Sequence, residues 1–194
     1  VALTLAITFL SSFAEKPIAV FYEKNGAVSY EELTRNVLIN SQNETTVTEN
    51  FNRSYAKKDW SSYANQALVL GSLNYRSNQK SNAIDFFKNA VTGFERSGSA
   101  EGQAMAHCAI GLVYQSSNQL DSAVEHYKRS IQLNHQANNY TGETKVRVLL
   151  SKVFEEREEH DSSLRNFKEA LDILPKSADS SLQAYFYNSY AEEL

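Results

Sequence analysis

Small, aromatic and aliphatic positions repeat along most of this chain at an interval of 40 residues. Gly71 and Gly111 begin a column of small residues that Ser151 and Ala191 continue. The other columns, which need no insertion, are Ala83, Ala123 and Ser163; Phe87, Tyr127 and Phe167; Ala90, Ser130 and Ala170; Leu70, Ile110 and Leu150; Ile84, Val124 and Leu164; Val91, Ile131 and Leu171; and the polar Lys88, Lys128 and Lys168. So many coincident columns indicate internal repeats, which decide the fold class.

Within each repeat the apolar residues recur at helical spacing. The pattern predicts three helix pairs and a last helix that opens a fourth unit: 61–77 with 81–96, 101–117 with 121–136, 141–157 with 161–174, and about 179–194. Asp121 and Asp161 stand where N-caps are expected, and Ser81 lies in the same column.

The columns also predict how the helices pack. Two antiparallel helices approach closely where small residues let their backbones nest, so we expect Gly71 to face Ala83 and Ala90. We expect the aromatic column to fill the space between one pair and the next. No pair can bury its apolar face alone, and the units must therefore stack into an all-α solenoid.

Residues 1–60 do not follow this register, so we divide the chain into a segment at 1–60 and repeats at 61–194. The units are about 61–98, 101–138 and 141–176, with a partial unit at 179–194. In the first segment Pro17, Asn25-Gly26 and the polar run 40–52 interrupt the pattern. Either strands 18–22 and 27–30 form a hairpin around Asn-Gly, or 15–24 and 30–39 are irregular helices; we prefer helices, as a capping unit.

The two ends of the chain carry apolar surfaces. Residues 1–14 are the most apolar stretch, and we favour a docked helix there over a secretory signal. That stretch is too short to span a membrane. The last helix exposes a face that is typical of a truncated array or of docking to a partner or a second copy: Tyr185, Phe186, Tyr187 and Tyr190.

Composition narrows the function classes. A formal net charge of −4 at pH 7 gives no basic footprint for nucleic acid. The single cysteine, Cys108, excludes an intrachain disulfide and a cysteine-based zinc cage. This usage is compatible with a reducing compartment, and we expect a cytoplasmic location, with a secretory signal at residues 1–14 as the alternative.

Candidate catalytic groups are sparse. His107 and Cys108 are adjacent and point about 100° apart on a helix, so they cannot form a nucleophile–base pair directly. We interpret His107 as packing between helices and Cys108 as a small apolar residue. The acidic run 155–161 is interpreted as a solvated helix end rather than a docking patch or cation site. No phosphate-binding glycine loop or metal-ligand spacing occurs, so we expect no enzyme, cofactor or metal.

The repeat resembles a known family. Gly111-Leu112-Val113-Tyr114, followed by Ala123, Tyr127 and Ser130, is similar to the tetratricopeptide repeat consensus. The usual period of that family is about 34 residues, so the longer interval here implies longer helices. Gly102 and Gly142 resemble the subclass of long repeats, which includes Pins-type G-protein-signalling modulators and bacterial regulators. The resemblance implies a right-handed superhelical solenoid.

In this family the first helix of each pair lines a concave groove. The resemblance therefore implies an inner surface that suits a segment with apolar anchors and some acidic residues. Its predicted residues are Asn65, Leu68, Ser72, Tyr75, Arg76, Met105, Cys108, Leu112, Gln115, Ser116, Lys145, Val148, Lys152, Glu155 and Glu156.

The leading hypothesis is a scaffold or adaptor module that binds another polypeptide in this groove, as part of a larger protein or complex. One alternative is a regulatory module that senses a peptide or small ligand. Another is the accessory arm of an enzyme whose catalytic domain lies elsewhere.

Overall fold

The computed structural model describes residues 41–177, which form seven α-helices and one 3-10 turn but no strand. These elements are α3 (Ser41–Lys57), α4 (Trp60–Arg76), α5 (Lys80–Ser97), α6 (Ala100–Gln115), α7 (Leu120–Gln136), α8 (Tyr140–Glu156), α9 (His160–Ile173) and η1 (Leu174–Lys176). Helices α4 to α9 begin and end within two residues of the predicted bounds. The predicted helix at 179–194 and the predicted elements of 1–40 lie outside the described residues.

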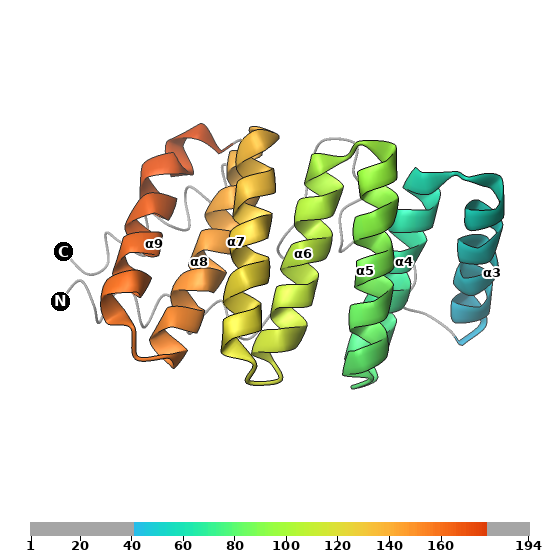
Figure 1. Ribbon diagram of the computed structural model, residues 1–194, viewed down its shortest axis with the longest axis horizontal. Coiled ribbons are helices and arrows are strands. Elements are labelled where there is room, and N and C mark those ends of the chain that lie inside the picture. The colour runs from blue at the N-terminus through green and yellow to red at the C-terminus, as the bar shows by residue number, and fades with distance from the viewer. Residues whose placement is uncertain (1–40, 178–194) are drawn as a thin grey trace.

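The helices form one row in chain order, with α3 and α9 at its opposite ends (Figure 1). Each helix packs against the next, most closely within the pairs α4–α5, α6–α7 and α8–α9. The expected all-α solenoid of stacked antiparallel helix pairs is confirmed. None of the helices within 41–177 has both the length and the apolar character needed to cross a membrane.

Residues with a left-handed backbone conformation follow the ends of the helices at an interval of 20 residues. Their φ angles lie between 54° and 74°, and the residues are Lys58, Asn78, Gly98, Asn118, Asn138 and Glu158. Glycine and asparagine tolerate this backbone region best, whereas it is unusual for lysine and glutamate. Every unit therefore reverses the chain with the same tight turn, and two such turns make up the 40-residue repeat.

Helix α3 shows that this regularity begins earlier than the sequence pattern indicated. The polar run 40–52, which was expected to interrupt the chain, lies almost wholly within α3. Val47 occupies the column of Phe87 and packs with Val69 and Leu70 of α4. Tertiary packing of one apolar face stabilises a helix whose residues have modest helix propensity. Separation of 1–60 as a capping segment stays a prediction, since 1–40 are not described.

Aromatic rings cover the glycines inside each pair. A Cβ atom added to Gly71 would lie 2.5 Å from the ring of Phe87, and one added to Gly111 would lie 2.7 Å from the ring of Tyr127. The side chain nearest to each of these glycines is thus the aromatic residue of the second helix. Small residues in the first helix make room for the large ring of the second.

The N-caps lie at the first helix of each pair rather than the second. Asp59, Ser99 and Asn139 accept hydrogen bonds from backbone N–H groups three residues later, at 3.1, 3.1 and 3.0 Å. Asp121 and Asp161, the expected caps, lie inside the first turns of α7 and α9. The prediction failed because the second helices begin one residue earlier, after Gln79, Gln119 and Glu159, whose side chains make no capping bond.

Candidate functional site

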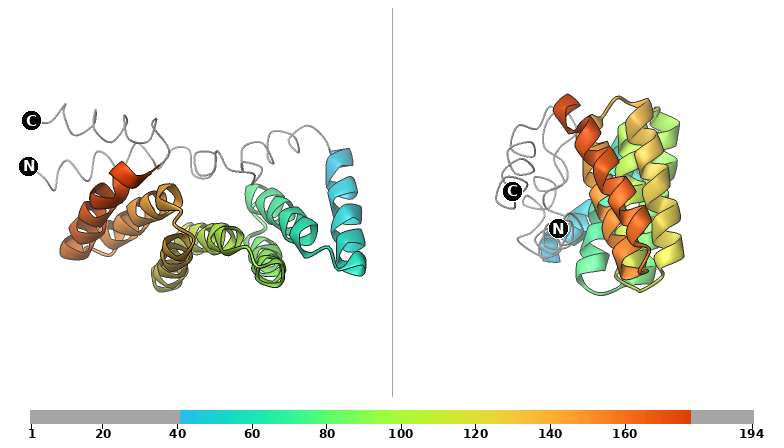
Figure 2. Two further views of the ribbon diagram at one scale, coloured as in Figure 1. Left: turned by 90° about the horizontal axis from the view of Figure 1, so that it is seen from above. Right: turned by 90° about the vertical axis from the view of Figure 1, so that its left-hand side faces the viewer.

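The row of helices bends into an arc, and α5 and α7 lie on its outer side (Figure 2). The first helices of the pairs, α4, α6 and α8, lie toward the inner side, and they carry the residues that were predicted for the groove. The repeated Lys88, Lys128 and Lys168 belong to the second helices and are exposed.

Apolar residues predicted for the groove are packed in the core. At most 8% of the surface of each is exposed, and they are Leu68, Met105, Cys108, Leu112 and Val148. Leu68 and Met105 belong to the core cluster around Phe87, while Cys108 and Leu112 pack with Tyr127. These side chains hold the helices together, so they are poor choices for testing a binding surface without unfolding.

Polar groove residues divide into a buried and an accessible set. Ser72 and Lys145 are buried, and the Ser72 hydroxyl donates to the Leu68 carbonyl at 2.7 Å. Asn65 and Lys152 are half-buried. The remaining positions form two adjacent columns at the carboxyl ends of α4, α6 and α8, which we name the inner rim: Tyr75, Gln115 and Glu155 are half-buried, and Arg76, Ser116 and Glu156 are exposed.

A chain of hydrogen bonds links the core to the inner rim. The Tyr127 hydroxyl donates to Gln115 Oε1 at 2.8 Å, and Gln115 Nε2 donates to Glu156 Oε1 at 2.7 Å. Burial raises the pKa of Tyr127, so its hydroxyl keeps its proton and remains a donor. The chain crosses from α7 through α6 to α8 and fixes the side chains of two rim residues.

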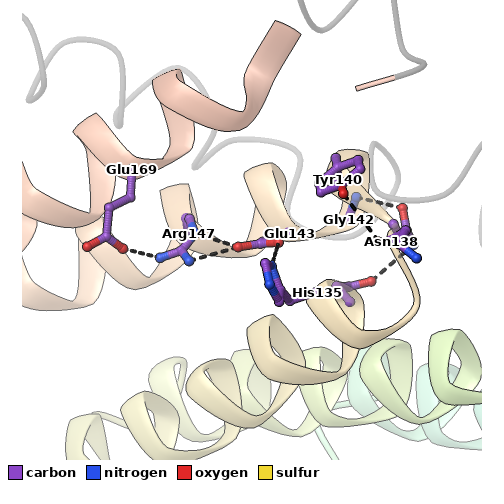
Figure 3. A network of polar contacts seen from close by, with 9 residues as sticks. His135, Asn138, Tyr140, Gly142, Glu143, Arg147 and Glu169 are labelled. Carbon is purple, nitrogen blue, oxygen red and sulfur yellow. Dashed lines mark hydrogen bonds and ion pairs between the residues drawn. The ribbon is translucent and has the colours of Figure 1, made fainter. Parts of the chain in front are cut away.

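A second polar network, which the sequence reasoning missed, joins α7, α8 and α9 (Figure 3). Only 1% of the Glu143 side chain is exposed. Its carboxylate accepts a bond from Arg147 at 2.7 Å and lies 3.0 Å from His135 Nδ1. Arg147 also pairs with Glu169 of α9. The spacing of Glu143 and Arg147, four residues on one helix, is the sequence signal that could have identified the pair.

Residues 102–176 match the tetratricopeptide repeat family model. The match runs from α6 to η1 and covers less than half of the chain. Among solved structures, the crystal structure of MamA is similar, with a TM-score of 0.50 and 20% sequence identity over 88% of this chain and 87% of that chain. Similarity at that identity shows the fold, a tetratricopeptide-type helical repeat. No curated protein matches the chain.

Cys108 and His107 of α6 are the adjacent candidate catalytic groups of the helical repeats. Burial raises the pKa of the Cys108 thiol to about 12, so the thiol stays protonated near neutral pH. His107 Nδ1 lies 3.0 Å from Nδ1 of His126 on α7. Residues 41–177 hold no group of three or more histidine, cysteine, aspartate or glutamate side chains that could bind a metal ion.

Ion pairs engage part of the acidic run at the end of α8. Glu155 lies 2.9 Å from His160, and Arg157 pairs with Glu159 at 2.7 Å and with Asp121 at 2.8 Å. Glu156 instead accepts from the uncharged Gln115. Among residues 41–177, Glu156, Glu158 and Asp161 of this run form no ion pair, and Glu156 is the one that belongs to the inner rim.

Proposed function

We propose that this chain is a protein-interaction module that binds a segment of another polypeptide along the inner rim. The observation that carries the proposal is a difference between columns. On the second helices one lysine repeats in every unit, as Lys88, Lys128 and Lys168, whereas equivalent rim positions differ in every unit. Repeated residues serve stacking, and varied residues are what a surface needs to distinguish a partner that is not itself a repeat.

The charges of the inner rim indicate the polarity of the bound segment. Arg76 lies at the α4 end of the rim, and Glu155 and Glu156 lie at the α8 end. A complementary segment places an acidic residue opposite Arg76 and a basic residue opposite Glu156. Tyr75 supplies a half-buried aromatic surface beside Arg76, and both residue types are frequent in binding hot spots.

The 40-residue period supports a finer assignment, to the subclass of long tetratricopeptide repeats that includes Pins-type modulators and bacterial regulators. The family model that matches residues 102–176 describes the tetratricopeptide repeat in general, so the subclass is part of this proposal. The proposed binding surface does not include Leu68 and Leu112, which were predicted for the groove, because both side chains pack in the core.

A pull-down with the purified chain, followed by mass spectrometry, would identify partners, and calorimetry would then measure affinity. We expect Tyr75→Ala and Arg76→Glu each to weaken binding about tenfold, the effect of losing one hot-spot contact. Lys128→Glu is the matched control, since Lys128 is exposed and belongs to α7, a helix on the outer side of the arc. Normal binding by both rim variants, with loss of binding by Lys128→Glu, would show that the outer face carries the interaction.

A further inference from the structure

A ladder of aromatic rings runs from the core to the surface between α3 and α4. Phe51 packs edge-on against Phe86 with ring centroids 5.8 Å apart, and it stacks on Tyr63 at 4.6 Å. Tyr63 in turn lies 5.5 Å from Tyr55 and 6.0 Å from Trp60. The ladder ends at the turn between the two helices, where Tyr55 meets the Trp60 ring edge-on at 5.9 Å.

The outer end of this ladder is open to solvent. Tyr55 is 57% exposed, and it is the single exposed large hydrophobic residue of 41–177. Trp60 is half-buried beside it. Because the inner rings fix their positions, Tyr55 and Trp60 present a preorganised aromatic surface, and little side-chain entropy is lost when a partner covers it.

Cations surround this aromatic surface. The Arg96 guanidinium of α5 lies over the Trp60 ring, 4.3 Å from its centroid. Arg96 is exposed, and a guanidinium stacked on a ring keeps the N–H donors at its edge available for a carboxylate. Lys57, the last residue of α3, and Lys58, in the adjoining turn, are also exposed.

The carboxylates of residues 41–177 form no close ion pair with these cations. No salt bridge joins Arg96, Lys57 or Lys58 to any of them, whereas Arg147 and Arg157 each form two. The nearby Asp59 carboxylate is engaged as the N-cap of α4, where it accepts from the Ser62 N–H at 3.1 Å. Asp59 also interacts electrostatically with Lys57. Three cations and this one carboxylate therefore flank the exposed aromatic surface, so positive charge exceeds negative charge among them.

We propose that Tyr55, Trp60, Arg96, Lys57 and Lys58 form a second docking surface, which binds an acidic polypeptide segment that carries a large apolar side chain. The apolar side chain covers the Tyr55 and Trp60 rings, and flanking carboxylates pair with Arg96 and the two lysines. Tyrosine, tryptophan and arginine are the residue types that dominate binding energy at protein interfaces.

This docking surface is separate from the inner rim. Trp60 begins α4 and Arg76 ends it, and at about 1.5 Å per residue these residues lie about 24 Å apart along the helix axis. The docking surface therefore does not depend on the proposed role of the rim, and the two can be tested independently in one protein.

Trp60 is the only tryptophan of the chain, so its fluorescence reports directly on this surface. The probe is a short synthetic peptide of glutamate and glycine with two phenylalanines; a second peptide carries lysine in place of glutamate, and a third lacks the phenylalanines. We expect the first peptide to change Trp60 fluorescence saturably. The lysine peptide should cause no saturable change, and the peptide without phenylalanine should bind about tenfold more weakly.

Variants assign the effect to residues. Arg96→Glu and Tyr55→Ala should each weaken binding of the first peptide about tenfold. Lys128→Glu, an exposed charge reversal on α7, and Arg76→Glu, at the other end of α4, should leave its affinity unchanged. Circular dichroism and thermal melting establish that each variant is folded, and Arg96→Gln serves as a milder change if the reversal destabilises α5.

Several results would overturn the proposal. One is the absence of saturable binding by the acidic peptide, and another is equal binding of the lysine peptide. A third is an equal loss of affinity in Arg96→Glu and Lys128→Glu, which would indicate net charge alone. Binding of phosphatidylserine vesicles in an Arg96-dependent manner, with no peptide binding, would assign the surface to an anionic membrane instead.

Discussion

His107 of α6 and His126 of α7 place their Nδ1 atoms 3.0 Å apart. One of these nitrogens must donate and the other accept, so at least one ring is uncharged while the bond persists. Their ring centroids are 5.2 Å apart, and the Tyr114 ring lies 5.5 Å from that of His126. Both histidine side chains are partly buried, and their contact links α6 to α7, the two helices of the middle unit.

Stability should therefore fall as the solution becomes acidic. Burial, followed by the charges of His126 and Arg129, lowers the pKa of His107 to about 4. Burial also lowers the pKa of His126; Lys88 adds to this and Glu125 opposes it. Below the ordinary histidine pKa of about 6.5, the unfolded chain therefore binds more protons than the folded chain. The free energy of unfolding should be highest above about pH 6.5 and should decline toward pH 4. Melting temperatures between pH 7.5 and 4.5 would measure this decline.

The double variant His107→Gln/His126→Gln should flatten the decline between pH 6.5 and 5, where few carboxylates titrate. His160→Gln is the matched control, because His160 is an exposed histidine in an ion pair at the start of α9. An unchanged pH profile in the double variant would show that other groups control the acid sensitivity.

The residue columns predicted the six helices α4 to α9 well, because each helix pair repeats at a fixed interval of 40 residues. The same columns could not show which side chain lies nearest to Gly71 across the pair, which is that of Phe87. The N-cap column Asp59, Ser99 and Asn139, at an interval of 40 residues, was visible in the sequence and marks the starts of α4, α6 and α8. The accessible site was harder to predict, because burial of Leu68, Leu112 and Lys145 depends on packing in three dimensions.

Gly111 should tolerate larger side chains poorly. A Cβ atom there would lie 2.7 Å from the ring of Tyr127, which is itself fully buried and cannot move aside freely. We expect Gly111→Leu to lower the free energy of unfolding by about 1–3 kcal/mol or more, as overpacking does. Urea denaturation measures the change. A wild-type midpoint in the leucine variant would mean that the crossing of α6 and α7 is looser than the structure indicates.

The capping side chains give a comparison within one molecule. Ser99→Ala and Asn139→Ala each remove the acceptor of a backbone N–H, at Gly102 and Gly142, and should cost about 1 kcal/mol. Gln119→Ala, at the start of α7, should cost much less, because its side chain makes no capping bond. Thermal denaturation of the three variants tests this order, and equal losses would contradict the assigned caps.

The buried Glu143 should be costly to neutralise. Glu143→Gln removes the negative charge beside Arg147 and His135, and loss of one member of a buried pair costs about 3 kcal/mol. The paired replacement Glu143→Leu/Arg147→Met should cost less than the sum of its two single changes, since neither charge is then left alone. Glu169→Gln is the control, because that carboxylate is 46% exposed. Strict additivity in denaturation experiments would show that Glu143 and Arg147 are not coupled.

Tyr127→Phe separates the packing role of the aromatic column from its link to the inner rim. Phenylalanine already occupies the same column at Phe87 and Phe167, so the ring should remain over Gly111. Only the hydroxyl that donates to Gln115 is lost, and the unfolding free energy should fall by about 1 kcal/mol. Tyr127→Ala, which also removes the ring, should cost about 3–5 kcal/mol.

The Tyr127→Phe variant should also loosen the side chains of Gln115 and Glu156, since Gln115 in turn holds Glu156. NMR spectra of the Gln115 side-chain amide would detect this change. If the amide signals and the affinity of a rim partner are both unchanged in Tyr127→Phe, the rim is ordered without help from the core, and the hydrogen-bond chain has no part in recognition.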